Sequence, residues 1–233
     1  MQINALHDWE VTAEEAIALQ QQLLPKIRLE PLPTEIRLVA GADVSYNLGS
    51  DRLYAGIVVL QLPELTLVKE VVAVGSASFP YIPGLLSFRE APILLQAFQQ
   101  LASCPDAIMV DGQGIAHPRG IGIASHLGLF LDCPSVGCAK SKLTGVYNAH
   151  TLPTTAGSST PLRRRDGTVI GAVVRTKSKT HPVFVSPGFK ADTPTSVALV
   201  LQCCQGYKLP EPTRLAHQLV NRARREDTAT GFF

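Results

Sequence analysis

The stretch IRLVAGADVSY, residues 36–46 of this 233-residue chain, decides the fold. It is a mostly apolar run, typical of a central strand buried on both faces, and it carries one carboxylate, Asp43, inside it. Two more strand-like runs, residues 53–62 and 65–74, follow after short polar or Gly/Pro breaks. This spacing predicts an antiparallel three-strand meander with Asp43 in its first strand.

The segments around the meander alternate between helix-like and strand-like patterns. The segment TAEE, residues 12–15, has the spacing of a capping box, and the apolar residues after it predict a helix over residues 12–24. Further helices are expected over residues 91–101, 121–131, 195–205 and 212–225, and further strands over residues 107–110, 135–139, 169–174 and 182–185. We therefore expect one α/β domain spanning residues 1–233, with a mixed sheet in which parallel strands follow the antiparallel meander and helices cover both faces.

The composition excludes several classes of protein. Apolar residues make up 45% of the chain, enough for one large core, but no run of eighteen apolar residues predicts a membrane span. The start MQINALHDWE lacks the pattern of a secretory signal. The five cysteines are odd in number and contain no C-x-x-C, which favours a reducing compartment and argues against a cysteine zinc site. We therefore expect a cytoplasmic protein.

The charges are sorted along the chain. Residues 1–111 hold 6 Lys/Arg and 13 Asp/Glu, a balance of −7, whereas residues 112–233 hold 15 and 6, a balance of +9. Such sorting fits a protein that binds an anionic polymer and keeps an acidic pocket for a cation. The alternative is that the charges are segregated by chance on a solvated surface.

Three carboxylates mark two expected strands and a helix start. Asp43 interrupts an apolar strand, where a metal ion, an arginine or a backbone cap must partner its charge. Asp111 ends the run AIMV and opens DGQG, which fits an Asp-Gly turn or a ligand group at a strand end. Glu90 lies in LSFREAP, where its spacing from Ser87 also fits a helix cap. Pro92 argues against that cap and places Glu90 just ahead of the helix.

Together these carboxylates supply the hard oxygen ligands that Mg²⁺ prefers, with Mn²⁺ as a substitute. The chain contains no G-x-x-x-x-G-K-[ST] loop, no G-x-S-x-G elbow and no His/Cys cluster with zinc spacing. The residues therefore favour a magnesium site over the other chemistries that these motifs would indicate.

Five segments, in order from about residue 41 to residue 217, resemble the endonuclease V family of nucleases that repair deaminated bases. They are GADVSY, FPYIPGLLSFREAP, VDGQGIAHPRGIGIASHLG, GCAKSKL and GYKLPEPTRLAH. The resemblance implies an RNase H-like fold and a magnesium-dependent DNA repair endonuclease. It also implies recognition of inosine (hypoxanthine) and a nick at the second phosphodiester bond on its 3′ side.

The resemblance assigns roles to individual residues. Asp43, Glu90 and Asp111 match the metal-binding and catalytic acids of the family. Lys140, in GCAKSKL, matches the family's lysine near the scissile phosphate, although by itself it fits a solvated surface lysine. His217, in PTRLAH, matches a position that is histidine in some members and acidic in others.

A second group of residues matches the part of the family that handles the damaged base. A wedge inserted beside the lesion corresponds to Pro80, Tyr81, Ile82 and Pro83. Backbone groups can distinguish inosine from adenine once the base is flipped out, and glycines let the backbone approach closely. The other residues expected at this lesion pocket are Gly84, Gly112, His117, Arg119 and Gly122. Tyr81 could instead pack in the core, and the loop residues could merely close a turn.

The expected partner is damaged DNA, duplex or single-stranded, bound by a monomer without a membrane segment. Six basic residues could contact the phosphates of the DNA, or could instead be the solvated side chains of a hairpin. They are Arg163, Arg164, Arg165, Arg175, Lys177 and Lys179. The alternatives are an inosine-specific ribonuclease, another RNase H-like nuclease such as a junction resolvase, and a DNA-binding module without catalysis.

Overall fold

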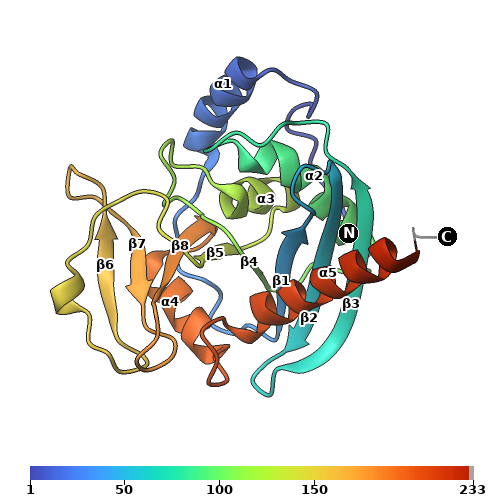
Figure 1. Ribbon diagram of the computed structural model, residues 1–233. Helices are drawn as coiled ribbons and strands as arrows, with labels where there is room; N and C mark the ends of the chain where they lie inside the picture. Colours follow the sequence, from blue (N-terminus) through green and yellow to red (C-terminus); the bar gives the residue numbers. More distant parts are fainter. Residues whose placement is uncertain (231–233) are drawn as a thin grey trace.

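The computed structural model describes residues 1–230 and is built around an eight-stranded mixed sheet (Figure 1). The strands lie in the order β3-β2-β1-β4-β5-β8-β7-β6. Their bounds are β1 Leu38–Ser45, β2 Arg52–Gln61, β3 Thr66–Ser76, β4 Ala107–Val110, β5 Ser135–Ala139, β6 Ser159–Arg163, β7 Val169–Val174 and β8 Val183–Phe189. The first three strands form the expected antiparallel meander, because β2 pairs with both β1 and β3.

Parallel pairing at the centre of the sheet aligns two of the predicted acids. β4 runs parallel to β1, and β5 runs parallel to β4. Ala42 pairs with Val110, and the N–H of Asp111 donates to the carbonyl of Ala42 at 3.0 Å. Because parallel strands end at the same edge of a sheet, Asp43 and Asp111 come to neighbouring positions there.

The parallel strands predicted after the meander are β4 and β5, and the strands beyond β5 are antiparallel. β8 pairs with β5, β7 with β8, and β6 with β7, each antiparallel. The sequence does not predict β6, because STPLR is short, contains a proline and buries only Thr160 and Leu162. It lies at the edge of the sheet, where a proline is tolerated. The mixed sheet is confirmed, and its parallel part consists of β1, β4 and β5.

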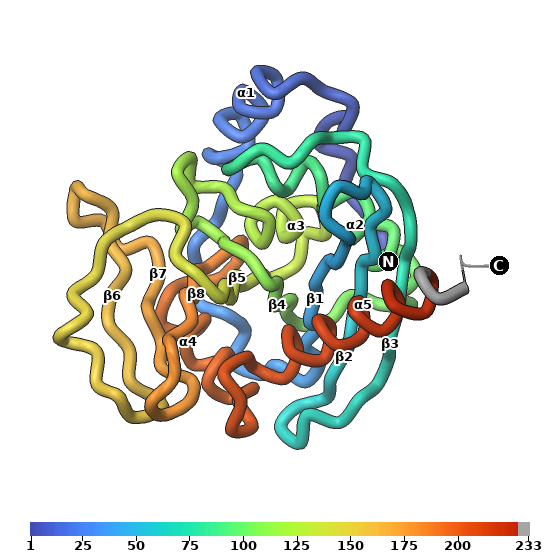
Figure 2. Tube along the Cα trace, viewed as in Figure 1, coloured from blue at the N-terminus to red at the C-terminus, as the bar shows by residue number. Residues whose placement is uncertain are grey.

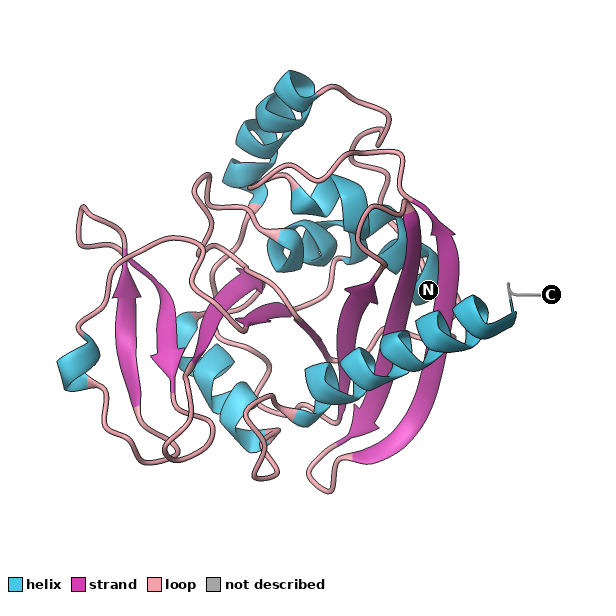
Figure 3. Ribbon diagram, in the orientation of Figure 1, coloured by secondary structure: helices cyan, strands magenta, loops and turns pink. Residues whose placement is uncertain are grey.

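Helices cover both faces of this sheet, as predicted (Figure 3). One face carries α2 Leu86–Gln99 and α3 Ile123–Leu131, and the other carries α4 Thr193–Gln202 and α5 Glu211–Thr230. The last helix is longer than the expected span of residues 212–225 and crosses over β1, β2 and β3 (Figure 2). No helix of the described chain is long and apolar enough to span a bilayer.

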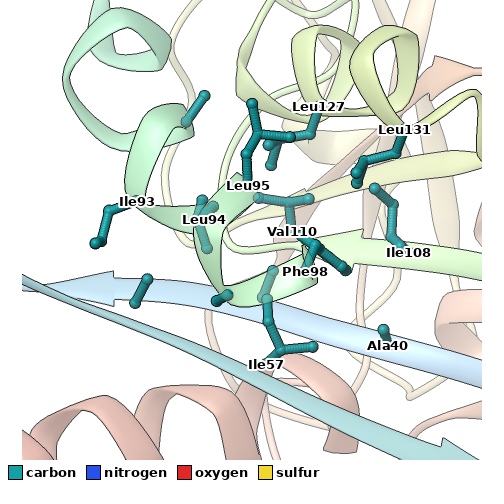
Figure 4. Packing of buried hydrophobic residues seen from close by; sticks show 14 of the residues in the cluster. Ala40, Ile57, Ile93, Leu94, Leu95, Phe98, Ile108, Val110, Leu127 and Leu131 are labelled. Atoms are coloured by element: carbon teal, nitrogen blue, oxygen red, sulfur yellow. The ribbon is translucent and has the colours of Figure 1, made fainter. Parts of the chain in front are cut away.

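Two apolar clusters lie on opposite faces of the sheet. Phe98 of α2 belongs to the first cluster, which packs α2 and α3 against the central strands (Figure 4). Leu199 of α4 and Leu219 of α5 belong to the second cluster. β1 contributes Ala40 to the first and Val39 to the second, because successive strand side chains point to opposite faces.

The helix expected over residues 12–24 is α1, Ala13–Leu23, which continues into the 3₁₀ turn η1 Leu24–Lys26. A second 3₁₀ turn, η2, spans Ala149–Thr151. The predicted capping box is confirmed. The Glu15 N–H donates to the Thr12 hydroxyl at 3.3 Å, and the Glu15 carboxylate accepts from the Thr12 N–H at 2.7 Å.

The segment before α1 lies along α2 and α3. The amino group of Met1 donates to the carbonyl of Leu101 at 2.7 Å. The ring of His7 lies 2.7 Å, between Nε2 atoms, from the fully buried ring of His126 in α3. Trp9 packs against the same histidines. His126 is therefore a core residue.

The start of α2 corrects one prediction. Glu90 was expected just ahead of a helix that begins at residue 91, but α2 already begins at Leu86, so Glu90 lies within it. Pro92 is accommodated inside the helix, where it only removes the hydrogen bond to the carbonyl of Phe88. Burial of most of the side chains of α2, including the fully buried Phe88, offsets that loss.

Candidate functional site

Two acidic side chains meet at the edge where β1 and β4 end. Asp43 is the sixth residue of β1, and Asp111 follows β4 directly. β4 is fully buried, and β1 is buried from residue 39 to residue 43, so each carboxylate sits at the end of a buried stretch of strand. Asp43 is buried, with 8% of the residue exposed, and one of its carboxylate oxygens accepts a hydrogen bond from the N–H of Val44 at 2.9 Å.

A cationic side chain and a histidine contact these two acids. His217, from α5, lies with Nδ1 2.7 Å from Oδ2 of Asp43. Lys140, which directly follows β5, forms an ion pair with Asp111. The Lys140 ammonium also lies 3.5 Å from Nδ1 of His217. The structure thus brings together four of the five predicted catalytic residues through direct contacts between their side chains.

The fifth, Glu90, lies beside them on α2. Its carboxyl is buried, and burial together with the charges of Asp43 and Asp111 raises its pKa to about 8. Burial and the charge of Asp43 also raise the pKa of Asp111, while Lys140 opposes that rise. These shifts mean that three carboxyls crowd one buried volume without enough positive charge to balance them.

The donor set suits a divalent cation. Asp43, Asp111 and His217 each present one ligand atom, and these atoms lie within 4.8 Å of one another. Burial, together with repulsion between the acids, raises the pKa of Glu90 and of Asp111, and a cation held there would offset that repulsion. Carboxylate oxygens are the ligands that Mg²⁺ prefers, so the residues fit the predicted magnesium site.

The imidazole of His217 is oriented from its other side by Asn221, one helical turn further along α5. The side-chain amide of Asn221 donates to the carbonyl of His217 at 2.8 Å and lies 3.1 Å from Nε2 of His217. Its oxygen accepts from Arg224 at 3.1 Å, which fixes the amide with its NH₂ group toward His217. Nε2 is then the acceptor, and Nδ1–H donates to Asp43.

The acids open into a cleft of about 430 Å³. Its other walls are formed by the wedge loop, residues 80–84, the glycine loop, residues 112–122, and the segment of residues 139–143. Besides Asp43, Glu90, Asp111 and Lys140, the predicted residues that line the cleft are Tyr81, Ile82, Pro83, Gly84, Gly112, His117 and Gly122. The candidate metal-binding acids and the candidate lesion pocket therefore share one continuous cavity.

The remaining predicted residues lie next to this cavity but do not line it. Pro80 is exposed at the start of the wedge loop. Arg119 points from the glycine loop to the carbonyl of Gly84, to which it donates at 2.6 Å. His217 contacts Asp43 from outside the lining.

The glycines of this region have a steric reason. A Cβ on Gly112 would lie 2.5 Å from the side chain of Ile123, and a Cβ on Gly122 would lie 2.3 Å from the carbonyl oxygen of Gln113. Such distances are far inside normal contact, so the two ends of the glycine loop pack too closely for any side chain.

Sequence reasoning missed several polar residues around the cleft. Gln113 lines it and donates to the carbonyl of Ser141 at 3.0 Å, while its buried side-chain oxygen has no hydrogen-bond partner within residues 1–230. Asn221 and Gln20 orient His217 and Gly84. Only the DGQG motif hinted at Gln113, and no sequence signal marked the other two as near the site.

The chain is similar to proteins of known type over nearly its whole length. A family model described as Endonuclease V matches residues 21–218. The endonuclease V of Gloeobacter violaceus is 48% identical over 223 residues, covering 95% of this chain and 90% of that relative. The crystal structure of endonuclease V from Streptomyces avermitilis has a TM-score of 0.88 and 41% identity, covering 97% of this chain and 98% of that one.

A third comparison includes a nucleic acid. A variant of endonuclease V from Ciona intestinalis was crystallised with a 23mer DNA containing an inosine followed by a ribo-adenosine. It superposes with a TM-score of 0.81 at 25% identity, covering 93% of this chain and 99% of that one.

Proposed function

The chain belongs to the endonuclease V family, and from this premise we propose that it recognises inosine in DNA and nicks the second phosphodiester bond on the 3′ side. As a member of the family it is a metal-dependent endonuclease with the RNase H-like fold that the solved structures share. The proposal concerns the finer points: the substrate base, the bond that is cut, the metal and the residues responsible.

One observation carries this proposal: the buried acids and the two loops line a single cleft. A nuclease that cuts beside a damaged base needs a place for the base and a cation site for the phosphate within reach of each other. The shared lining of Asp43, Glu90 and Asp111 with Tyr81 and Gly84 supplies both. The inosine-containing DNA bound by the Ciona relative supports this choice of base.

We assign the cation to Asp43 and Asp111, with Glu90 as the third acid. Bound Mg²⁺ supplies charge neutralisation on the phosphoryl oxygens and lowers the pKa of water, which hydrolysis of a phosphodiester requires. Lys140 would place a positive charge on the phosphate, since its ammonium is partly exposed beside Asp111. His217 would hold Asp43 in position through its Nδ1–H.

The lesion would be read by backbone groups. Inosine differs from adenine where an amine has become a carbonyl and N1 carries a hydrogen, and backbone N–H and C=O groups can test both changes. The glycine loop brings backbone to the cleft with no side chain in the way at Gly112 and Gly122. The base must leave the stack to reach this loop, which Tyr81 would assist from the wedge loop.

A gel assay tests the proposal. Labelled duplexes that carry inosine or adenine at one position are incubated with Mg²⁺ or EDTA, alongside a strand in which ribonucleotides flank the inosine. We expect a nick only with inosine and Mg²⁺, at the second bond 3′ to the lesion. Cleavage confined to the ribonucleotide strand would favour the inosine-specific ribonuclease instead. Equal cleavage of strands with and without inosine would exclude both the inosine-specific DNA endonuclease and the inosine-specific ribonuclease.

Substitution of the acids tests the assignment of residues. Asp43→Ala and Asp111→Ala should each lower nicking by about a thousandfold, because a bound cation contributes several kcal/mol to the transition state. Both variants should still bind the inosine duplex. The control is Glu64→Ala, which removes an exposed acid from the turn between β2 and β3. Near-normal nicking by either aspartate variant would remove that residue from the proposed site.

A further inference from the structure

The carbonyl oxygen of Gly84, at the end of the wedge loop, accepts hydrogen bonds from three side chains. Arg119 Nη2 donates at 2.6 Å, His117 Nε2 at 3.0 Å and Gln20 Nε2 at 3.1 Å. A carbonyl oxygen has two lone pairs, so three donors saturate it. Gly84 also has a φ of +81°, and a Cβ there would lie 2.8 Å from Arg119 Nη2. This peptide group is therefore held in one orientation from three directions.

Gln20 links three parts of the molecule that are distant in sequence. It lies in the last turn of α1 and is fully buried. Its side-chain oxygen accepts from Nε of Arg119 at 2.5 Å, and its nitrogen also donates to the carbonyl of Ile121 at 3.3 Å. Burying a polar amide is unfavourable unless its hydrogen bonds are made. Here the partners belong to the wedge loop, through Gly84, and to the glycine loop, through Arg119 and Ile121.

His117 is suited to its part in this arrangement. The backbone N–H of Arg119 lies 3.2 Å from Nδ1 of His117, which makes Nδ1 the acceptor and leaves Nε2–H to donate to Gly84. Burial, with the charge of Arg119, lowers the pKa of His117 to about 4. The ring is thus neutral at pH 7 and does not repel the guanidinium beside it.

We propose that Gln20 is a positioning residue for base selection: through Arg119 and the carbonyl of Gly84 it holds the wedge loop against the glycine loop and so sets the width of the cleft that receives the base. The inference rests on the proposed function. Gln20 lies one residue before the range 21–218 that matches the family. It does not line the cleft, so it acts through Gly84 and Arg119 rather than by touching the base.

The effect of such a residue falls on discrimination rather than on hydrolysis. The wedge loop and the glycine loop form two walls of the cleft, whereas the acids sit on β1, α2 and the end of β4. Without Gln20, Arg119 loses the partner of its Nε and Gly84 loses one of its three donors. The two walls can then separate, and a pocket of looser fit favours inosine less over the normal base.

The test measures binding without catalysis. Affinities for an inosine duplex and for the undamaged duplex of the same sequence are measured by fluorescence anisotropy in EDTA. Gln20→Leu should weaken inosine binding about tenfold, the factor that corresponds to about 1.4 kcal/mol, while binding of the undamaged duplex stays unchanged. Gln20→Glu, which keeps an acceptor for Arg119 but offers no N–H to Gly84, should show a loss in the same direction. The matched control is Gln22→Leu, an exposed glutamine in the same turn.

Two further measurements separate positioning from a merely structural role. With saturating inosine duplex and Mg²⁺, the single-turnover nicking rate of Gln20→Leu should remain within about twofold of the wild type, because the acids are untouched. When Arg119 is already replaced by Ala, Gln20→Leu should cause little further loss of affinity for the inosine duplex, since the effects of residues that act as a unit do not add. Equal loss of affinity for both duplexes, or additive losses in the double variant, would overturn the proposal. A wild type that shows no preference for inosine would instead refute the proposed function.

Discussion

At the scale of single residues, the site is defined by charge that is left unbalanced. Asp43 and Asp111 each contact one positively charged or hydrogen-bond-donating side chain, that of His217 and of Lys140 respectively. Glu90 is buried beside both acids, and among the causes of its pKa shift only Arg89 opposes the rise. A buried carboxyl with that environment holds its proton at neutral pH until a cation arrives. Glu90 is therefore the group through which pH should act on the metal-free protein.

This leads to a prediction for stability. The pKa of Glu90 is raised from 4.5 to about 8 in the folded chain, so between these values the folded state binds the proton and the unfolded state does not. Stability contributed by the protonated carboxyl is full below pH 4.5 and is lost as the pH rises through 8. In EDTA, the free energy of unfolding of the wild type should therefore fall from pH 5 to pH 8 relative to Glu90→Gln.

Urea titrations of the two proteins at several pH values measure this difference. Mg²⁺ added at pH 8 should raise the melting temperature of the wild type more than that of Glu90→Gln, because the cation replaces the proton. A difference between the two proteins that does not change with pH would show that Glu90 is already ionised in the folded state.

The sequence predicted these acids unequally. Asp43 and Asp111 stand inside or directly after apolar strand patterns, and such patterns locate a side chain to within a residue. Glu90 was identified as an acid of the site, but Pro92 suggested a helix boundary that the structure does not have. Gln20 could not be found from the sequence, because it is one of three adjacent glutamines and only the packing of α1 buries it.

At the scale of elements, the wedge loop is set between two rigid supports. It connects β3 to α2, and the carbonyl of Ile82 accepts from the N–H of Leu85 at 2.9 Å. Pro80 and Pro83 restrict the backbone on either side of Tyr81. The Tyr81 side chain is 62% exposed while also lining the cleft, which excludes the alternative that it packs in the core.

A second prediction concerns Tyr81. Stacking on an aromatic ring contributes about 1–3 kcal/mol per base, and it can offset the cost of removing a base from a duplex. Tyr81→Ala should therefore weaken nicking of an inosine duplex about tenfold or more, but nicking of single-stranded inosine DNA much less, since no stack must open. The melting temperature should stay nearly unchanged because the side chain is exposed.

The control for this experiment is Tyr207→Ala, which removes another exposed tyrosine. Nicking rates of each variant are measured on the duplex and on the single-stranded substrate, and the ratio of the two rates is compared with that of the wild type. Equal losses on both substrates would mean that Tyr81 contacts the nucleic acid without opening the stack.

Local sequence patterns predict some of the strands and helices of the fold but not all of them. The meander, the short strands β4, β5 and β7 and the helix α3 follow apolar periodicity and lie within two residues of their expected positions. The edge strand β6 has no such pattern, since only two of its side chains are buried. Its pairing with β7, and the antiparallel course of β8, depend on contacts between distant residues that no local window contains.

At the scale of the whole molecule, six of the fifteen Lys and Arg residues in residues 112–233 lie in or next to the hairpin of β6 and β7. The basic residues of that region do not form one cluster. Arg163, Arg164 and Arg165 lie at the turn between the strands, whereas Arg175 follows the other end of β7. A Cβ on Gly120 would lie 2.9 Å from Nη2 of Arg164, so the turn reaches the glycine loop beside the cleft. This end of the hairpin therefore lies next to the candidate site.

The third prediction follows from that separation. Affinity for duplex DNA should fall linearly with salt in a log–log plot, with a slope of about −0.9 for each neutralised phosphate. The double variant Arg164→Ala/Arg165→Ala should flatten this slope by about two, at similar cost for inosine and undamaged duplexes. Lys177→Ala/Lys179→Ala, at the far end of the hairpin, serves as the matched control and should change the slope by less than one. The opposite ranking of the two variants would place the DNA at the other end of the hairpin.

The fourth prediction concerns the expected single domain. The apolar clusters on the two faces share strands β1, β2 and β4, so losing one face exposes the other side of the same strands. Trp9, the only tryptophan of the sequence, packs beside α2 and α3 and reports on one face alone. Leu199→Ala alters the other face, where it should cost about 2–5 kcal/mol by leaving a cavity. If the chain unfolds as one unit, this variant shifts the urea midpoint seen by Trp9 fluorescence and by circular dichroism equally. The contrary result is a Trp9 midpoint that does not shift while the circular dichroism signal changes in two steps. That result would mean that the chain unfolds as two domains. The fold around the acids would then depend on packing against α2 and α3 and not on packing against α4 and α5.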